Sequence, residues 1–126
     1  MKNKNIIQLY QKMSAAFDDN QKYLPAKIAY LIQKNLTKLQ ILSREIEDAK
    51  NSIIIYYGEI QEDESYIIPE HLISTAQKEL DDLLDIEQNI DFLHLKFKDI
   101  ENLEFTSNQM EALMFMIDDG DDDQVE

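Results

Sequence analysis

"IAYLIQKNLTKLQILSREIEDAKNSIIIY" (residues 28–56) is the longest periodic stretch of the chain and sets its architecture. Apolar residues recur in it at intervals of four and three, the seven-residue repeat of a helix with one buried seam. The seam positions are Ile28, Ile32, Asn35, Leu39, Leu42, Ile46, Ala49, Ile53 and Tyr56. The pattern predicts one long helix over about residues 25–57, which ends near Gly58.

Two packing arrangements are compatible with such a seam. The helix either packs within its own small domain or pairs with a second copy in a coiled coil, which would make the chain a homo-oligomer. Leu31, Leu36 and Ile41 widen the apolar face beyond a narrow two-stranded seam, which favours the first arrangement. Asn35 is polar, and a polar residue on a seam is able to fix register or oligomeric state.

Shorter periodic segments flank the long helix. Helices are expected over about residues 3–18, 69–88 and 107–118. Pro69 suits the first turn of the second of these helices, and Thr106 with Gln109 forms a capping-box pattern before the third. Residues 59–65 are predicted to be a polar connection.

One segment changes its period from that of a helix to that of a strand. Leu93, Leu95 and Phe97 alternate with polar residues, which predicts a strand over about residues 92–98, with residues 66–68 as its nearest partner. The predicted fold class is therefore mainly α with a small β element (α+β). It comprises a long central helix in a helical bundle or hairpin, a short two-stranded sheet and a C-terminal helix. Residues 1–119 are expected to form a single helical domain, and residues 120–126 a disordered acidic tail.

Composition narrows the class of protein. A chain of 126 residues fits one domain, and the absence of cysteine is compatible with a reducing cytoplasm. Eighteen apolar residues never run together, so no membrane span is expected. Polar residues interrupt the apolar run of the first seventeen residues, so a signal peptide is not expected either.

The formal net charge of −14 is unevenly distributed. Residues 1–60 contain nine Lys/Arg and six Asp/Glu, a charge of +3, whereas residues 61–126 contain three Lys and twenty acids, a charge of −17. Such a chain either folds its halves against each other or offers one strongly negative surface to a partner. Direct binding of nucleic acid through the second half would be opposed electrostatically.

The residue types that carry catalysis or bind metals lack the spacing that such sites need. A calcium loop with Gly120 at its sixth position would place Phe115 and Ile117 where acids are required. His71 and His94 have no second histidine three or four residues away. A nucleophile motif and a phosphate-binding glycine loop are also missing. We therefore expect a non-enzymatic protein without a metal or cofactor.

The second half of the chain carries a family resemblance. Its features are the pattern EL-x-x-LL at residues 79–84, a short strand ending in an acidic turn at residues 93–99, and T-x-x-Q-M-x-x-L at residues 106–113, continued to residue 117. Together with the long central helix, over about residues 25–118, they resemble an uncharacterised family of small acidic helical proteins of tailed bacteriophages and prophages. The resemblance transfers no catalytic residues. It implies a protein that binds a host or phage protein in the cytoplasm of the host bacterium.

Two groups of residues are candidates for contacting such a partner. One is a row of carboxylates on the predicted third helix: Glu79, Asp81, Asp82 and Asp85. The other is a soft apolar surface on the last helix: Met114, Phe115 and Met116. The alternative for the methionines is that they complete the core.

The main functional prediction is a non-enzymatic phage or mobile-element accessory protein that binds another protein with a basic surface. Inhibition of a host defence or nucleic-acid-handling protein is one form of this activity. One alternative is a nucleic-acid mimic that occupies the groove of a nuclease or CRISPR-type effector. Another is a structural factor, either in virion assembly or as an oligomeric helical spacer.

Overall fold

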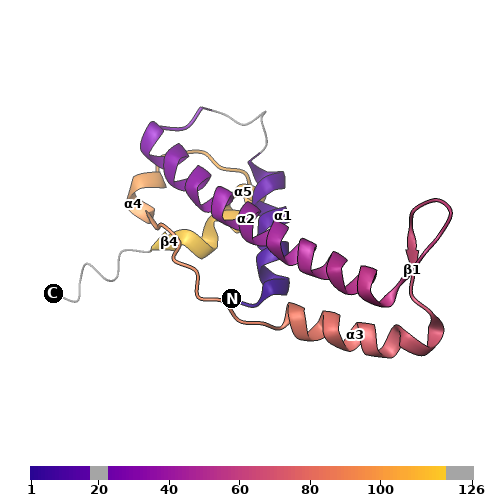
Figure 1. Cartoon of the computed structure of the whole chain (residues 1–126). Coiled ribbons are helices and arrows are strands. Elements are labelled where there is room, and N and C mark those ends of the chain that lie inside the picture. The colour runs from indigo at the N-terminus through magenta and orange to yellow at the C-terminus, as the bar shows by residue number, and fades with distance from the viewer. Residues whose placement is uncertain (18–22, 119–126) are drawn as a thin grey trace. The chain divides into compact units, whose positions relative to one another are not determined.

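The computed structural model describes residues 1–17 and 23–118, and its fold is mainly α with a small amount of β structure, as predicted. Residue 18, residue 119 and the predicted tail over residues 120–126 lie outside the described residues. The elements labelled in Figure 1 and those between them are, in chain order, α1 (Asn3–Ala16), α2 (Ala26–Tyr57), β1 (Glu59–Ile60), β2 (Tyr66–Ile67), α3 (Glu70–Leu84), β3 (Leu95–Lys96), α4 (Phe97–Ile100), α5 (Ser107–Leu113), the 3₁₀ turn η1 (Met114–Met116) and β4 (Ile117–Asp118).

The chain divides into two compact units, and α1 and α2 each contribute residues to both. Unit 1 comprises Met1–Ile7 and Ile41–Asn89, and unit 2 comprises Gln8–Gln40 and Ile90–Glu126. Each unit has its own buried apolar residues. Those of unit 1 are Ile6, Ile46 and Ala76. Those of unit 2 are Met13, Phe17, Ile28, Ile32, Leu39, Leu95, Ile100, Ala112, Leu113 and Met116.

Helix α2 is the long predicted helix, but its buried seam is shorter than predicted. The seam is buried or half-buried from Ile28 to Ile53, whereas Tyr56 is 79% exposed. A straight α-helix drifts by about 20° per heptad relative to an exact seven-residue repeat, so the last position has turned about 80° from the first. Ser43 is accordingly buried beside the half-buried Leu42, and Ile41 is exposed.

Asn35 has partners within unit 2. Its side chain is fully buried, and its Nδ2 donates to the carbonyl oxygen of Leu93 at 2.7 Å while its Oδ1 accepts from the Leu93 N–H at 2.9 Å. The same Nδ2 lies 3.4 Å from Met116 Sδ. The amide therefore pairs with the backbone of Leu93 as a neighbouring strand would. These contacts account for a polar residue on the seam without a second copy of the chain.

The strand predicted over residues 92–98 is shorter, and its partner is different. β3 contains only Leu95 and Lys96, and α4 begins at Phe97. β3 pairs in parallel with β4, whereas β2 pairs with β1 in an antiparallel hairpin. A longer strand is not formed because the backbone of Leu93 is already bound by Asn35, and Phe97 is 47% exposed instead of facing inward with Leu95.

Two helices end earlier than predicted. α3 ends at Leu84, not near residue 88, because the start of the chain binds one carbonyl in its last turn and one beyond it: Asn3 Nδ2 donates to Leu83 O at 2.8 Å, and Asn3 N to Ile86 O at 3.0 Å. α5 ends at Leu113, since pairing with β3 requires extended backbone at residues 117–118. The capping box predicted for Thr106 and Gln109 is confirmed. Across residues 1–17 and 23–118, no helix combines the length and apolar character needed to cross a bilayer.

Candidate partner-binding surface

Unit 1 carries a β-hairpin that joins the end of α2 to the start of α3 (Figure 1). A single residue, Gly58, separates α2 from β1. A Cβ atom at Gly58 would lie 2.6 Å from the carbonyl oxygen of Ile54 and 3.1 Å from Cβ of Tyr66. Glycine at this position therefore allows β1 to begin one residue after α2 ends.

The hairpin closes through a structured loop, residues 62–64. Gln61 N donates to Ser65 O at 2.8 Å and Glu64 N to Gln61 O at 3.0 Å, while Glu64 adopts a left-handed φ of 69°. This is a turn followed by a left-handed residue, a common way to close a hairpin. The Asp63 carboxylate accepts from Ser65 Oγ at 2.6 Å and Ser65 N at 3.1 Å, and these bonds lower the pKa of Asp63. The predicted polar connection is thus a defined hairpin.

The end of α2 is tied to α3 by a tyrosine and a carboxylate. A side-chain hydrogen bond with Glu79 raises the pKa of Tyr57, because the phenol proton is needed for the bond. The ring of Tyr57 also packs edge to face against Tyr56, with centroids 4.9 Å apart. The end of α2, next to the hairpin, is therefore joined to α3.

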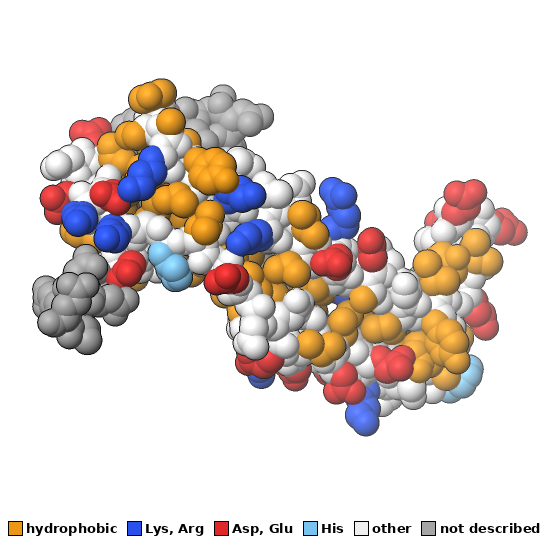
Figure 2. Space-filling view, turned by 60° about the vertical axis from the view of Figure 1, so that its left-hand side comes forward, with side chains coloured by type: hydrophobic (Ala, Val, Ile, Leu, Met, Phe, Trp, Pro, Cys, Tyr) orange, Lys and Arg blue, Asp and Glu red, His pale blue; other side chains and the backbone are white. Residues whose placement is uncertain are grey.

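Five large apolar side chains at this end of unit 1 remain exposed, and we call them the hairpin surface: Ile55, Tyr56, Ile60, Tyr66 and Ile67. Ile60 pairs with Tyr66 across the strands, so the two share one face of the hairpin, while Ile67 shares the other face with Glu59. The exposed fractions of Ile60 and Ile67 are 64% and 58%. Figure 2 shows hydrophobic side chains gathered over the hairpin, interspersed with acidic ones. Large apolar side chains that gather at one exposed end of a unit are candidates for contact with a partner.

The charge around the hairpin surface has a single sign. Residues 51–77 contain five acids and no Lys or Arg. All five are exposed: Glu59, Glu62, Asp63, Glu64 and Glu70. The surface is therefore both apolar and negative.

The carboxylates predicted as an acidic row on α3 are partly neutralised. Asp85 Oδ1 lies 3.7 Å from the Lys2 ammonium and 3.5 Å from that of Lys4. The Glu79 carboxylate raises the pKa of the Tyr57 phenol, a contact that leaves its own charge in place. Asp82 is exposed, as are the other three carboxylates. The structure thus brings Lys2 and Lys4, which are far from the row in the sequence, to one end of it.

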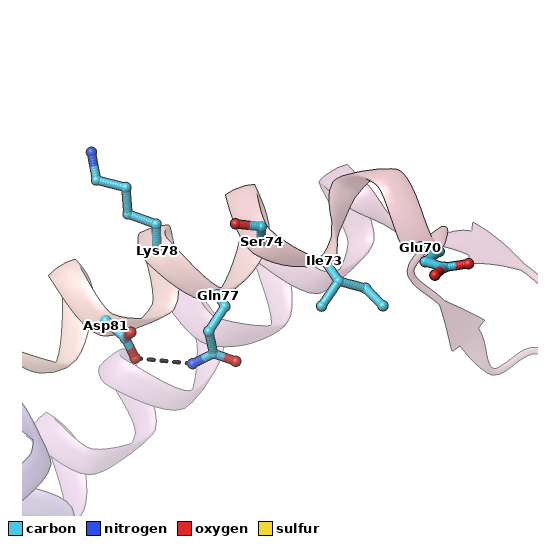
Figure 3. A pocket seen from close by; sticks show the side chains of 6 residues that line it. All are labelled: Glu70, Ile73, Ser74, Gln77, Lys78 and Asp81. Carbon is cyan, nitrogen blue, oxygen red and sulfur yellow. Dashed lines mark hydrogen bonds between the residues drawn. The ribbon is translucent and has the colours of Figure 1, made fainter.

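Asp81 lines a shallow depression of about 590 Å³ on α3 (Figure 3). In Figure 3 the Gln77 amide points toward Asp81, and a hydrogen bond of 2.9 Å joins Gln77 Nε2 to Asp81 Oδ1. The lining residues all belong to one helix: Glu70, Ile73, Ser74, Gln77, Lys78 and Asp81. One helix cannot enclose a ligand, so the depression has the character of a solvated helix face.

The three residues predicted as a soft apolar surface occupy three different environments. Met114 is 68% exposed, whereas Met116 is fully buried beside Asn35. Phe115 is half-buried and packs edge to face on Phe92, with ring centroids 4.9 Å apart. They therefore form no common surface, and Met116 belongs to the core of unit 2.

The predicted absence of a metal site concerns the His, Asp and Glu residues of the chain. Within the described ranges, no three or more His, Cys, Asp or Glu side chains are grouped so as to hold a metal ion. His71 and His94 are both exposed. The sequence predicts that no calcium loop forms around Gly120, and Gly120 lies outside the described ranges.

Sequence reasoning missed the hairpin surface because strands of two residues are too short to show a period. The only signal was the pair of short segments at residues 59–60 and 66–67, each with an isoleucine, on either side of a loop rich in Asp and Glu. The seven-residue repeat also places Tyr56 on the buried seam, which hides its exposure.

The chain matches no family model, and searches of curated proteins and of solved structures found no match to it. The fold and the surface together define a mainly α protein that exposes a negatively charged apolar hairpin.

Proposed function

We propose that the protein is a non-enzymatic accessory factor of a phage or mobile element, which acts by binding another protein through the hairpin surface. The observation that carries the proposal is the exposure of Ile60 and Ile67 on the two faces of the hairpin. Full burial of one large apolar side chain is worth about 1.5–3 kcal/mol, so a partner that covers these residues gains substantial affinity.

The biological setting of the proposal comes from the resemblance of residues 25–118 to small acidic phage proteins. In that setting, the protein binds and inhibits a host defence or nucleic-acid-handling protein in the cytoplasm of the host. The negative charge at residues 51–77 supports a partner with a basic surface.

The two alternative functions have less support. A nucleic-acid mimic needs a rigid row of free carboxylates, but Asp85 is offset by Lys2 and Lys4. An oligomeric spacer needs the heptad seam for a second copy, but Asn35 and Leu39 are already buried within unit 2.

Capture from bacterial lysate on the immobilised protein tests the proposal. The parent is compared with the double variant Ile60→Ser/Ile67→Ser and with a matched control, Ile41→Ser/Ile86→Ser, which changes two isoleucines that are also exposed but lie outside the hairpin. We expect a protein that the parent and the control retain and the hairpin variant loses, because the variant removes the apolar contacts and keeps the charge.

Circular dichroism of each variant shows whether the helices are intact, so that loss of binding is not confused with unfolding. Equal retention by the parent and the hairpin variant would contradict the proposed surface. Retention that is lost instead on Asp81→Asn/Asp82→Asn would favour the nucleic-acid mimic.

A further inference from the structure

We infer that the hairpin surface binds a cationic amphipathic segment of the partner protein. Apolar side chains of this segment cover Ile60 and Tyr66, which share one face of the hairpin, and its Lys or Arg side chains reach the carboxylates of the adjoining loop. The inference rests on the proposed function and adds the chemistry of the partner.

The hairpin places apolar and acidic groups at short, fixed spacing. Glu59 lies directly opposite Ile67 on one face, and Ile60 lies opposite Tyr66 on the other. The acidic loop follows within a few residues of both strands, and its backbone and Asp63 hydrogen bonds hold it in one conformation. Glu62 and Glu64 are each two positions along the chain from Ile60 or Tyr66, which is about 7 Å of backbone at 3.4 Å per residue. An amphipathic helix, whose Lys side chains flank its apolar stripe, presents both kinds of group at this scale.

Charge selects among the occupants of such an apolar surface. Unit 1 contains thirteen Asp/Glu and five Lys/Arg, a formal charge of −8. A second copy would bring the same uncompensated carboxylates of residues 51–77 against this hairpin, and nucleic acid or an anionic membrane would also bring negative charge. A cationic segment is the occupant that gains both from apolar burial and from charge pairing.

The probe for the test is a fluorescently labelled amphipathic helix made of leucine and lysine. Its binding to the full chain is measured by anisotropy at an ionic strength of about 0.15 M, where charges farther apart than about 8 Å are screened. A peptide with glutamate in place of every lysine is the charge control. We expect the lysine peptide to bind and the glutamate peptide not to bind.

Two pairs of variants locate the binding. Glu62→Gln/Glu64→Gln neutralises two loop carboxylates, and Glu45→Gln/Asp48→Asn makes the same charge change on the exposed side of α2 in the same unit. We expect the loop pair to weaken binding of the lysine peptide by about five-fold to ten-fold, since two exposed charge pairs contribute about 1 kcal/mol together. The α2 pair should change it by less than about two-fold, and Ile60→Ser/Ile67→Ser should abolish it.

If both pairs of carboxylate variants weaken binding equally, the attraction depends only on net charge and the inference is wrong. The inference is also wrong if the lysine peptide does not bind. If the lysate partner is lost on Ile60→Ser/Ile67→Ser while neither carboxylate pair affects the peptide, the proposed function stands and the cationic segment is wrong. A dimer in solution that Ile60→Ser/Ile67→Ser dissociates would assign the surface to a second copy and would also overturn it.

Discussion

Asn3 and Asn35 have corresponding roles in the two units. Each is buried, and each uses its side-chain amide to bind backbone groups where a helix ends or a strand begins. Asn3 donates to Leu83 O at the end of α3, while Asn35 binds both the N–H and the carbonyl of Leu93 before β3. A buried polar group left without a partner costs about 1–3 kcal/mol, so these amides replace hydrogen bonds that a longer helix or strand would have made.

Replacement of Asn35 by alanine should lower the free energy of unfolding by about 2–4 kcal/mol, because it leaves two backbone groups of Leu93 unpaired and a small cavity. Guanidinium titration followed by circular dichroism measures the change. Gln33→Ala is the matched control in the same helix, since Gln33 is exposed and its side chain donates to the exposed Thr37 hydroxyl at 3.3 Å; its effect should be within about 0.5 kcal/mol. An Asn35→Ala variant as stable as the parent would mean that the amide does not hold this segment.

At the scale of elements, local patterns predicted structure well and long-range pairing poorly. The period of residues 28–53 identified α2, and the Thr106/Gln109 capping box identified the start of α5, because each depends on neighbours within one turn. The strand at residues 92–98 was overestimated because alternation alone does not show that a distant side chain, Asn35, binds the backbone of Leu93.

The same limit applies to the candidate site. The acids of α3 are visible in the sequence, but the pairing of Asp85 with Lys2 and Lys4 joins residues about eighty positions apart. The hairpin was equally hidden, because its two strands have two residues each and its exposed isoleucines resemble core residues in composition. The exposure of a side chain depends on the fold, so it cannot be read directly from a single sequence.

The junction of α2 with the hairpin depends on Gly58. Gly58→Ala should lower the free energy of unfolding by about 1–3 kcal/mol, because the new Cβ would lie 2.6 Å from the Ile54 carbonyl oxygen and force the backbone to move. Limited proteolysis at the hairpin and thermal unfolding measure the effect. Ser52→Ala, an exposed change in the same helix, should shift stability by no more than about 0.5 kcal/mol. Unchanged proteolysis of Gly58→Ala would show that the junction tolerates a side chain.

At the scale of the whole molecule, the charge asymmetry of the sequence is only partly balanced by ion pairs. Lysines of the first half pair with acids of the second, as Lys12 does with Glu111 at 3.1 Å and Lys27 with Asp99 at 3.6 Å. Yet the excess acids are concentrated in unit 1, whose formal charge is −8, while the described residues of unit 2 contain six Lys and six Asp/Glu. Unit 1 is therefore under electrostatic self-repulsion that its few ion pairs do not cancel.

Added sodium chloride should raise the thermal unfolding temperature of the protein. Screening weakens both the repulsion among the acids of unit 1 and its ion pairs, but exposed ion pairs contribute only about 0–1 kcal/mol each. Repulsion among thirteen acids facing five bases outweighs the attraction within these pairs, so the loss of repulsion dominates. Chloride is chosen over sulfate because sulfate also strengthens apolar burial.

Charge variants of unit 1 determine whether this repulsion is the cause. Glu45→Lys/Asp82→Lys makes unit 1 less negative at two exposed positions and should flatten the dependence of the unfolding temperature on salt. Lys2→Gln/Lys4→Gln removes the cations beside Asp85 and should steepen it. An unfolding temperature that falls as salt rises would mean that the ion pairs outweigh the repulsion. The negative charge of unit 1 would then contribute to the stability of the fold through its ion pairs.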